Sequence, residues 1–126
     1  MYDIIGHADV IKRFGYVPAP EQTEERLALE NAALQAIAKS GCAMELNASG
    51  LSKPCAEMFP SRRMLTEVIR LGIPLTMGSD AHDPMKLGDG LSEAEALLHE
   101  LGCKEVAVFE GRQRSLIPLN VDNSKV

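Results

Sequence analysis

The chain has 126 residues, enough for one compact domain, and its 45% hydrophobic and 25% charged residues are ordinary for a globular protein. Its net charge is −5 and its Lys and Arg residues form no cluster, so the sequence excludes a nucleic-acid-binding surface. No apolar run approaches about 20 residues, which predicts no membrane span. Three cysteines without a C-x-x-C pair indicate a reducing, cytoplasmic environment.

Short apolar runs, each with the length of a buried strand, recur along the chain. They cover residues 2–5, 43–46, 73–77 and 105–109. Residues 112–119 add a last extended segment, and the polar tail at 120–126 lies beyond the domain formed by residues 1–119.

Three helices are predicted between these runs, over residues 23–40, 61–71 and 92–101. The second begins at Ser61, a good N-cap residue, and the third begins at a capping box formed by Ser92 and Glu95. The resulting order, βαβαβαβ, predicts an α/β fold in which crossover helices connect the strands of a parallel sheet.

Polar side chains follow the first three predicted strands at the point where each ends. His7 follows the first strand, Asn47 and Ser49 follow the second, and Asp80 and His82 follow the third. The carboxyl ends of parallel strands meet at one edge of a sheet, so these groups are expected to face one cleft. A carboxylate and an imidazole two residues apart suit Zn, Mn or Fe(II). A polar turn that starts the next helix remains the alternative reading of this segment.

Other residues near this edge suit an anionic substrate. Arg13 and Lys53 are candidates for contact with a phosphate group, since the acidic chain as a whole does not attract one. Asn47 and Ser49 are expected either to hydrogen-bond a substrate or to satisfy backbone groups of their own loop. Asp9 is expected to cap the short segment 10–14.

At these residues the chain resembles a known family. The segments 5–14, 45–61, 72–82 and 106–112 are similar, in this order, to blocks of the PHP (polymerase and histidinol phosphatase) family, in its histidinol-phosphatase branch. The clearest block is Gly78-Ser79-Asp80-Ala81-His82, which resembles the final metal motif of that branch.

This resemblance implies a distorted (β/α)7 barrel with a cluster of divalent metal ions (Zn, Mn or Fe) at its carboxyl edge. It implies that His7, Asp80 and His82 are metal ligands and that Arg13 contacts the substrate phosphate. The implied reaction is the hydrolysis of L-histidinol phosphate to L-histidinol and phosphate, a step of histidine biosynthesis.

The chain also departs from the family pattern. The N-terminal metal motifs are absent, so we expect the C-terminal half of a barrel, completed by a complementary N-terminal half-barrel chain or by a homodimer. Ser52 stands where the family often has a phosphate-binding Arg. A PHP-type phosphoesterase with another substrate, such as a nucleotide, and a non-catalytic relic that serves as a binding domain therefore remain alternatives.

Overall fold

The computed structural model describes residues 1–17 and 19–119, so the predicted tail at 120–126 lies outside the described residues. Its helices and strands in chain order are β1 (Ile4–Ile5), α1 (Thr23–Ser40), β2 (Ala43–Asn47), α2 (Arg62–Arg70), β3 (Leu75–Gly78), α3 (Leu91–Glu100), β4 (Glu105–Glu110) and β5 (Gln113–Pro118). Short 3-10 helices lie between them: η1 (Val10–Phe14), η2 (Pro20–Gln22), η3 (Ala48–Ser52) and η4 (Pro84–Lys86). No helix in the described part of the chain has both the length and the apolar character that a membrane span requires.

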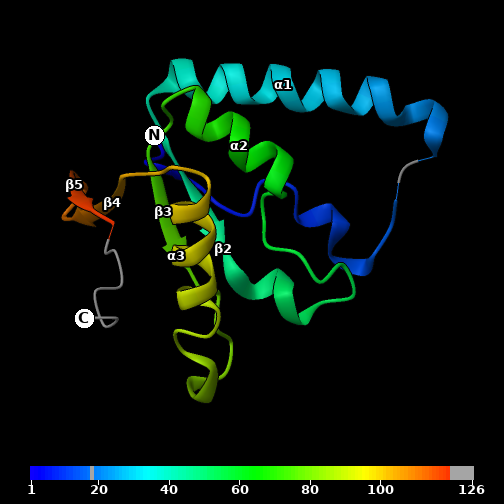
Figure 1. Cartoon of the computed structure of the whole chain (residues 1–126). Helices are drawn as coiled ribbons and strands as arrows, with labels where there is room; N and C mark the ends of the chain where they lie inside the picture. Colours follow the sequence, from blue (N-terminus) through cyan, green and yellow to red (C-terminus); the bar gives the residue numbers. More distant parts are fainter. Residues whose placement is uncertain (18, 120–126) are drawn as a thin grey trace.

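The first three strands form a parallel sheet in the order β1-β2-β3, as the alternation of strands and helices predicted. Met44 pairs with Ile5 on one side and with Leu75 on the other, which fixes the register of all three strands. Pro74 precedes β3 and delays its start relative to the predicted run at 73–77. Because the strands are parallel, the segments that follow them leave from one edge of the sheet (Figure 1).

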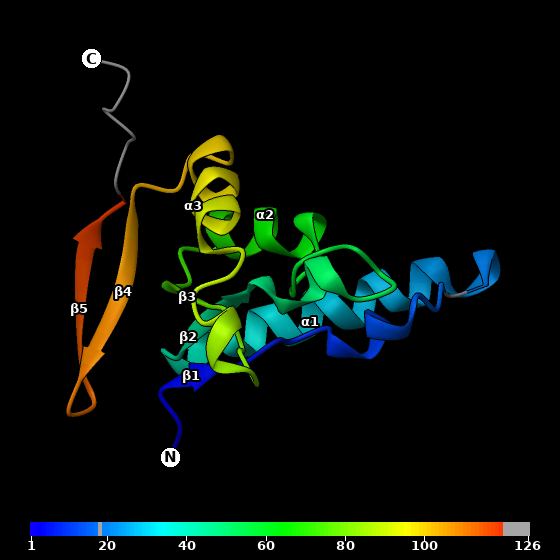
Figure 2. The ribbon, with the colours of Figure 1, turned by 90° about the horizontal axis from the view of Figure 1, so that it is seen from below.

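The fourth predicted strand does not join this sheet, so its predicted parallel pairing is wrong. β4 pairs with β5 in a separate antiparallel hairpin, which stands to one side of α3 and the parallel sheet (Figure 2). Gly111 and Arg112 form the two-residue turn with φ values of 53° and 67°. Two successive residues with positive φ are typical of the tight turns that join antiparallel strands.

Each observed helix begins and ends within one residue of its predicted bounds. α1 has the predicted bounds, and the hydroxyl of Ser61 accepts a hydrogen bond from the backbone N–H of Met64, so Ser61 caps α2. The predicted capping box of α3 is wrong because that helix starts earlier, after Gly90, whose φ is 78°. A Cβ atom on Gly90 would lie 2.7 Å from that of Ala48, so close packing against η3 favours glycine there.

The hydrophobic core lies between the parallel sheet and the three helices. Side chains alternate across a strand, so Met44 and Leu46 of β2 share the face that the helices cover. The core residues on the helices are Leu34, Met64, Leu65, Val68, Ala94 and Leu98. The same alternation places Glu45 on the opposite face of the sheet, which faces away from the helices.

An ion pair connects the hairpin to the start of the chain. The guanidinium of Arg112 donates to the carboxylate of Asp3 over 2.7 Å from Nε and 3.1 Å from Nη2. The hydrogen bond from Arg112 lowers the pKa of Asp3, and the pKa of Arg112 is raised in return.

Candidate active site

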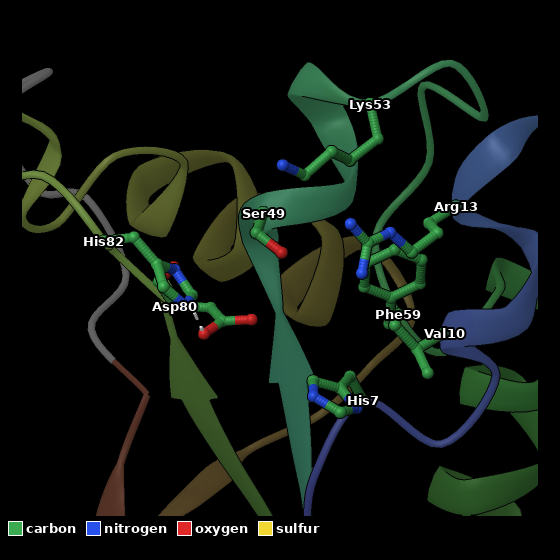
Figure 3. A pocket seen from close by; sticks show the side chains of 8 residues that line it. All are labelled: His7, Val10, Arg13, Ser49, Lys53, Phe59, Asp80 and His82. Atoms are coloured by element: carbon green, nitrogen blue, oxygen red, sulfur yellow. Dashed lines mark hydrogen bonds and ion pairs between the residues drawn. The ribbon is translucent and has the colours of Figure 1, made fainter.

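A pocket of about 330 Å³ lies at the carboxyl edge of the parallel sheet. Figure 3 shows its lining residues, which come from the segments after β1, β2 and β3. They are His7, Val10, Arg13, Ser49, Lys53, Phe59, Asp80 and His82. The structure therefore brings together six of the seven residues predicted for the site, and only Asn47 is not part of the lining.

Asp80 and His82 lie side by side at one end of the pocket (Figure 3). Asp80 has a left-handed backbone with φ of 51°, which is uncommon outside glycine but tolerated by Asp. Its carbonyl oxygen lies 2.9 Å from Nδ1 of His82. If Nδ1 carries the proton of that hydrogen bond, Nε2 keeps a lone pair for a metal ion. The His82 side chain is 87% exposed, so Nε2 is accessible.

His7 reaches the pocket from the segment after β1. Its backbone N–H donates to Oε1 of Glu45 over 3.2 Å, and its ring lies apart from Asp80 and His82 (Figure 3). Across residues 1–17 and 19–119, no three His, Cys, Asp or Glu side chains lie close enough to hold one metal ion. The donor chemistry of Asp80 and His82 thus fits a divalent metal, but the described residues do not close a coordination shell.

Two cations enter the pocket from its other side, Arg13 from η1 and Lys53 from the end of η3 (Figure 3). Neither side chain makes an ion pair or hydrogen bond with another described residue. Ser49 places its hydroxyl between them and Asp80. A small anion in this pocket would therefore meet two positive charges and a hydroxyl without displacing an existing partner.

Asn47 is not part of the pocket lining and is only 1% exposed. Its Nδ2 donates to Oε1 of Glu45 over 2.9 Å and to Oδ2 of Asp80 over 3.2 Å, and its Oδ1 accepts from the N–H of Ser49 over 2.9 Å. These bonds occupy both amide hydrogens and the carbonyl oxygen. Asn47 therefore orients two residues of the pocket lining, Asp80 and Ser49.

Glu45 connects the residues around this site, although the sequence did not single it out as a site residue. It accepts from both His7 and Asn47, and its Oε2 lies 2.5 Å from where a Cβ of Gly78 would be. Its carboxylate thus touches the ends of all three parallel strands. The available signal was a carboxylate inside a short apolar strand, two positions before Asn47 and so on the same face.

Asp9 does not cap the segment that it precedes, contrary to expectation. η1 has no side-chain cap, and Oδ2 of Asp9 accepts instead from the N–H of Ser61, at the start of α2, over 2.8 Å. Asp9 therefore fastens η1, which carries Arg13, to a helix that is distant in the sequence.

Comparison with known proteins relates this site to one class of enzyme. No family model matches the chain. The chain is 34% identical to an assigned histidinol-phosphatase of Deinococcus radiodurans, over 94% of this chain and 42% of that protein. It is 27% identical to the histidinol-phosphatase of Lactococcus lactis, over 87% of this chain and 41% of that protein.

A solved structure gives the same relationship. The crystal structure of an assigned histidinol phosphatase from Listeria monocytogenes matches with a TM-score of 0.65 and 28% identity, over 71% of this chain and 35% of that one. The chain is thus similar to histidinol phosphatases over most of its length, and it spans less than half the length of each of these proteins.

Proposed function

We propose that this chain provides part of the active site of a metal-dependent phosphomonoester hydrolase that converts L-histidinol phosphate to L-histidinol and phosphate. The observation that carries the proposal is the pocket itself. His and Asp side chains, which are of the types that bind metals, line a 330 Å³ space at the carboxyl edge of a parallel sheet. The same space is lined by two cations, Arg13 and Lys53, that make no ion pair with another described residue. The names of the similar proteins, which are histidinol-phosphatases, suggest the substrate.

In this proposal Asp80 and His82 hold a divalent metal ion (Zn, Mn or Fe), and His7 contributes from across the pocket. The hydrogen bond from Asn47 to Asp80 and the contact between the Asp80 carbonyl and His82 would orient these ligands. A bound metal would offset the negative charge on the phosphoryl oxygens.

Arg13, Lys53 and Ser49 would hold the phosphate group. The chain carries a net charge of −5, so a phosphate dianion must be attracted by particular side chains. A guanidinium can bind two phosphate oxygens at once, and the Lys53 ammonium can act as a point charge beside it. This assigns to Lys53 the phosphate contact that Ser52, with its short side chain, cannot make.

The metal ligands that the described residues do not provide would come from another polypeptide or from a second copy of this chain. β1 has two residues and ends the sheet on one side, and Glu45 lies on the sheet face away from the helices. Both features suit the half of a distorted barrel, in which further parallel strands continue the sheet and enclose this face. We propose that a complementary N-terminal half-barrel, or a second copy of this chain, supplies them.

The test is phosphate release from L-histidinol phosphate, in the presence of Mn²⁺ or Zn²⁺, by this chain alone and mixed with a polypeptide that matches the rest of the Deinococcus relative. We expect hydrolysis in the mixture, loss of that activity in His82→Ala, and its retention in His99→Ala, because His99 is exposed on α3. Faster hydrolysis of a nucleoside monophosphate would contradict the assignment of L-histidinol phosphate as the substrate. Absence of hydrolysis under all these conditions would overturn the enzymatic proposal.

A further inference from the structure

Arg13 lies on a short element that has little packing of its own. η1 contains no fully buried residue, and the Arg13 guanidinium lies 4.8 Å from the ring centroid of its neighbour Phe14. A short 3-10 helix without a buried side chain does not by itself hold a cation at a fixed place. Something else must therefore fix Arg13 relative to the pocket.

Lys12, the neighbour of Arg13, points away from the pocket into a dense set of acceptors. Its ammonium lies 2.6 Å from Oε1 of Glu57, 2.7 Å from the carbonyl oxygen of Met58 and 3.1 Å from Oδ2 of Asp9. It also lies 5.5 Å from the ring centroid of Phe59. The ammonium donates hydrogen bonds to Glu57 and Met58 and forms an ion pair with Asp9, so Lys12 is not free to bind phosphate.

The partners of Lys12 connect η1 to the start of α2 and to the end of β2. Asp9 and Glu57 accept from the backbone N–H groups of Ser61 and Arg62, at the start of α2. The backbone of Phe59 pairs with that of Asn47 through two hydrogen bonds of 2.7 and 3.0 Å. Lys12 therefore joins η1 both to α2 and to the end of β2, where Asn47 holds Asp80.

We propose that Lys12 is a positioning residue, which sets the place of Arg13 and thereby the phosphate affinity of the pocket without touching phosphate. This inference rests on the proposed role of Arg13 in the function above. An ion pair that is only partly buried contributes little net stability, so its main effect here is to specify one arrangement of η1.

The test is a double-mutant cycle in the 126-residue chain, with inorganic phosphate as the probe and NMR titration as the measurement. Lys12→Met and Arg13→Met should each weaken phosphate binding by about tenfold, the scale of one charge-assisted hydrogen bond. The double variant should bind no more weakly than Arg13→Met alone, because Lys12 acts through Arg13. Lys12→Met combined with Lys53→Met should instead give additive losses, since Lys53 lies on another element.

Two further measurements separate positioning from folding and from charge. Lys39→Met, at the exposed end of α1, removes the same charge and should leave phosphate affinity unchanged. Amide hydrogen exchange should quicken over residues 10–14 in Lys12→Met while α1 keeps its protection.

The outcomes distinguish this inference from the function on which it rests. If the unmodified chain binds phosphate and Lys12→Met binds it equally well, or if the losses of Lys12→Met and Arg13→Met add, the positioning role of Lys12 is overturned and the proposed function stands. If the unmodified chain does not bind phosphate, the assignment of the pocket as a phosphate site fails as well.

Discussion

The side-chain amide of Asn47 donates to Oδ2 of Asp80 over 3.2 Å, so a buried residue at the end of β2 orients an exposed carboxylate beyond the end of β3. The same amide group also donates to Glu45, which places it between two carboxylates. A neutral double donor satisfies both of them, and a third carboxylate in its place would repel both.

Replacing Asn47 with Asp should therefore destabilise the fold. The change introduces an unpaired charge at a buried position beside two like charges, and we expect it to cost about 3 kcal/mol or more of unfolding free energy. Asn31→Asp is the matched control, because Asn31 is exposed on α1 and its Oδ1 faces the Arg63 guanidinium. Urea unfolding measures both variants. Equal stability of Asn47→Asp and the unmodified chain would contradict the bonding pattern described for Asn47.

Gly50 should not tolerate a side chain. A Cβ there would lie 1.9 Å from the backbone oxygen of Glu57 and 3.2 Å from the ring of Phe59, and the backbone cannot move aside without breaking the bridge to Asn47. We expect Gly50→Ala to cost about 2 kcal/mol or more, as other overpacked sites do. Thermal unfolding measures the change, and a melting temperature within error of the unmodified chain would count against the packing of η3.

Gly78→Ala provides a comparison for Gly50→Ala. Its Cβ would lie 2.5 Å from Oε2 of Glu45, at the flexible end of a side chain, so the carboxylate can move and the stability loss should be smaller than for Gly50→Ala. The displaced Glu45 should release its hydrogen bonds to His7 and Asn47. NMR should then report shifts at those two residues with α2 unaffected, and unshifted signals would show that Glu45 does not organise the edge.

Acid should loosen the docking of the β4–β5 hairpin. The folded pKa of Asp3 lies below its ordinary value because Arg112 hydrogen-bonds the carboxylate. The stabilisation from this pair is therefore complete above the unfolded pKa and is lost as pH falls through the lowered, folded pKa. Hydrogen exchange at acidic and neutral pH should show a pH-dependent loss of hairpin protection relative to α1 that Arg112→Met removes. The same pH response in that variant would exclude the ion pair as its cause.

The sequence allowed the parallel sheet and most of the site to be predicted, because both rest on local patterns. The bounds of α1 followed from its Ala and Leu content, its acidic first turn, Lys39 in its last turn and Gly41 after it. The rule that polar groups collect beyond parallel strands placed His7, Asp80 and His82 at one pocket. The pairing of β4 was mispredicted because an isolated apolar run does not reveal its neighbour. The signal lay in the turn at Gly111 and Arg112.

The roles of Glu45 and Lys12 could not be predicted for a different reason. Both depend on contacts between residues far apart in sequence, 38 positions from His7 to Glu45 and 45 from Lys12 to Glu57. In the sequence Glu45 lies between two apolar residues and Lys12 lies between Ile11 and Arg13, and neither pattern indicates the distant partner.

A metal site at Asp80 and His82 can be tested by locating Mn²⁺ on the chain through paramagnetic broadening of NMR signals, which detects even an incomplete and weak site. We expect broadening centred on residues 79–83 and on His7, its loss in His82→Ala and its retention in His99→Ala. Broadening that is unchanged in His82→Ala, or that centres on carboxylates outside the pocket, would contradict a metal site at Asp80 and His82 and with it the metal-dependent phosphatase.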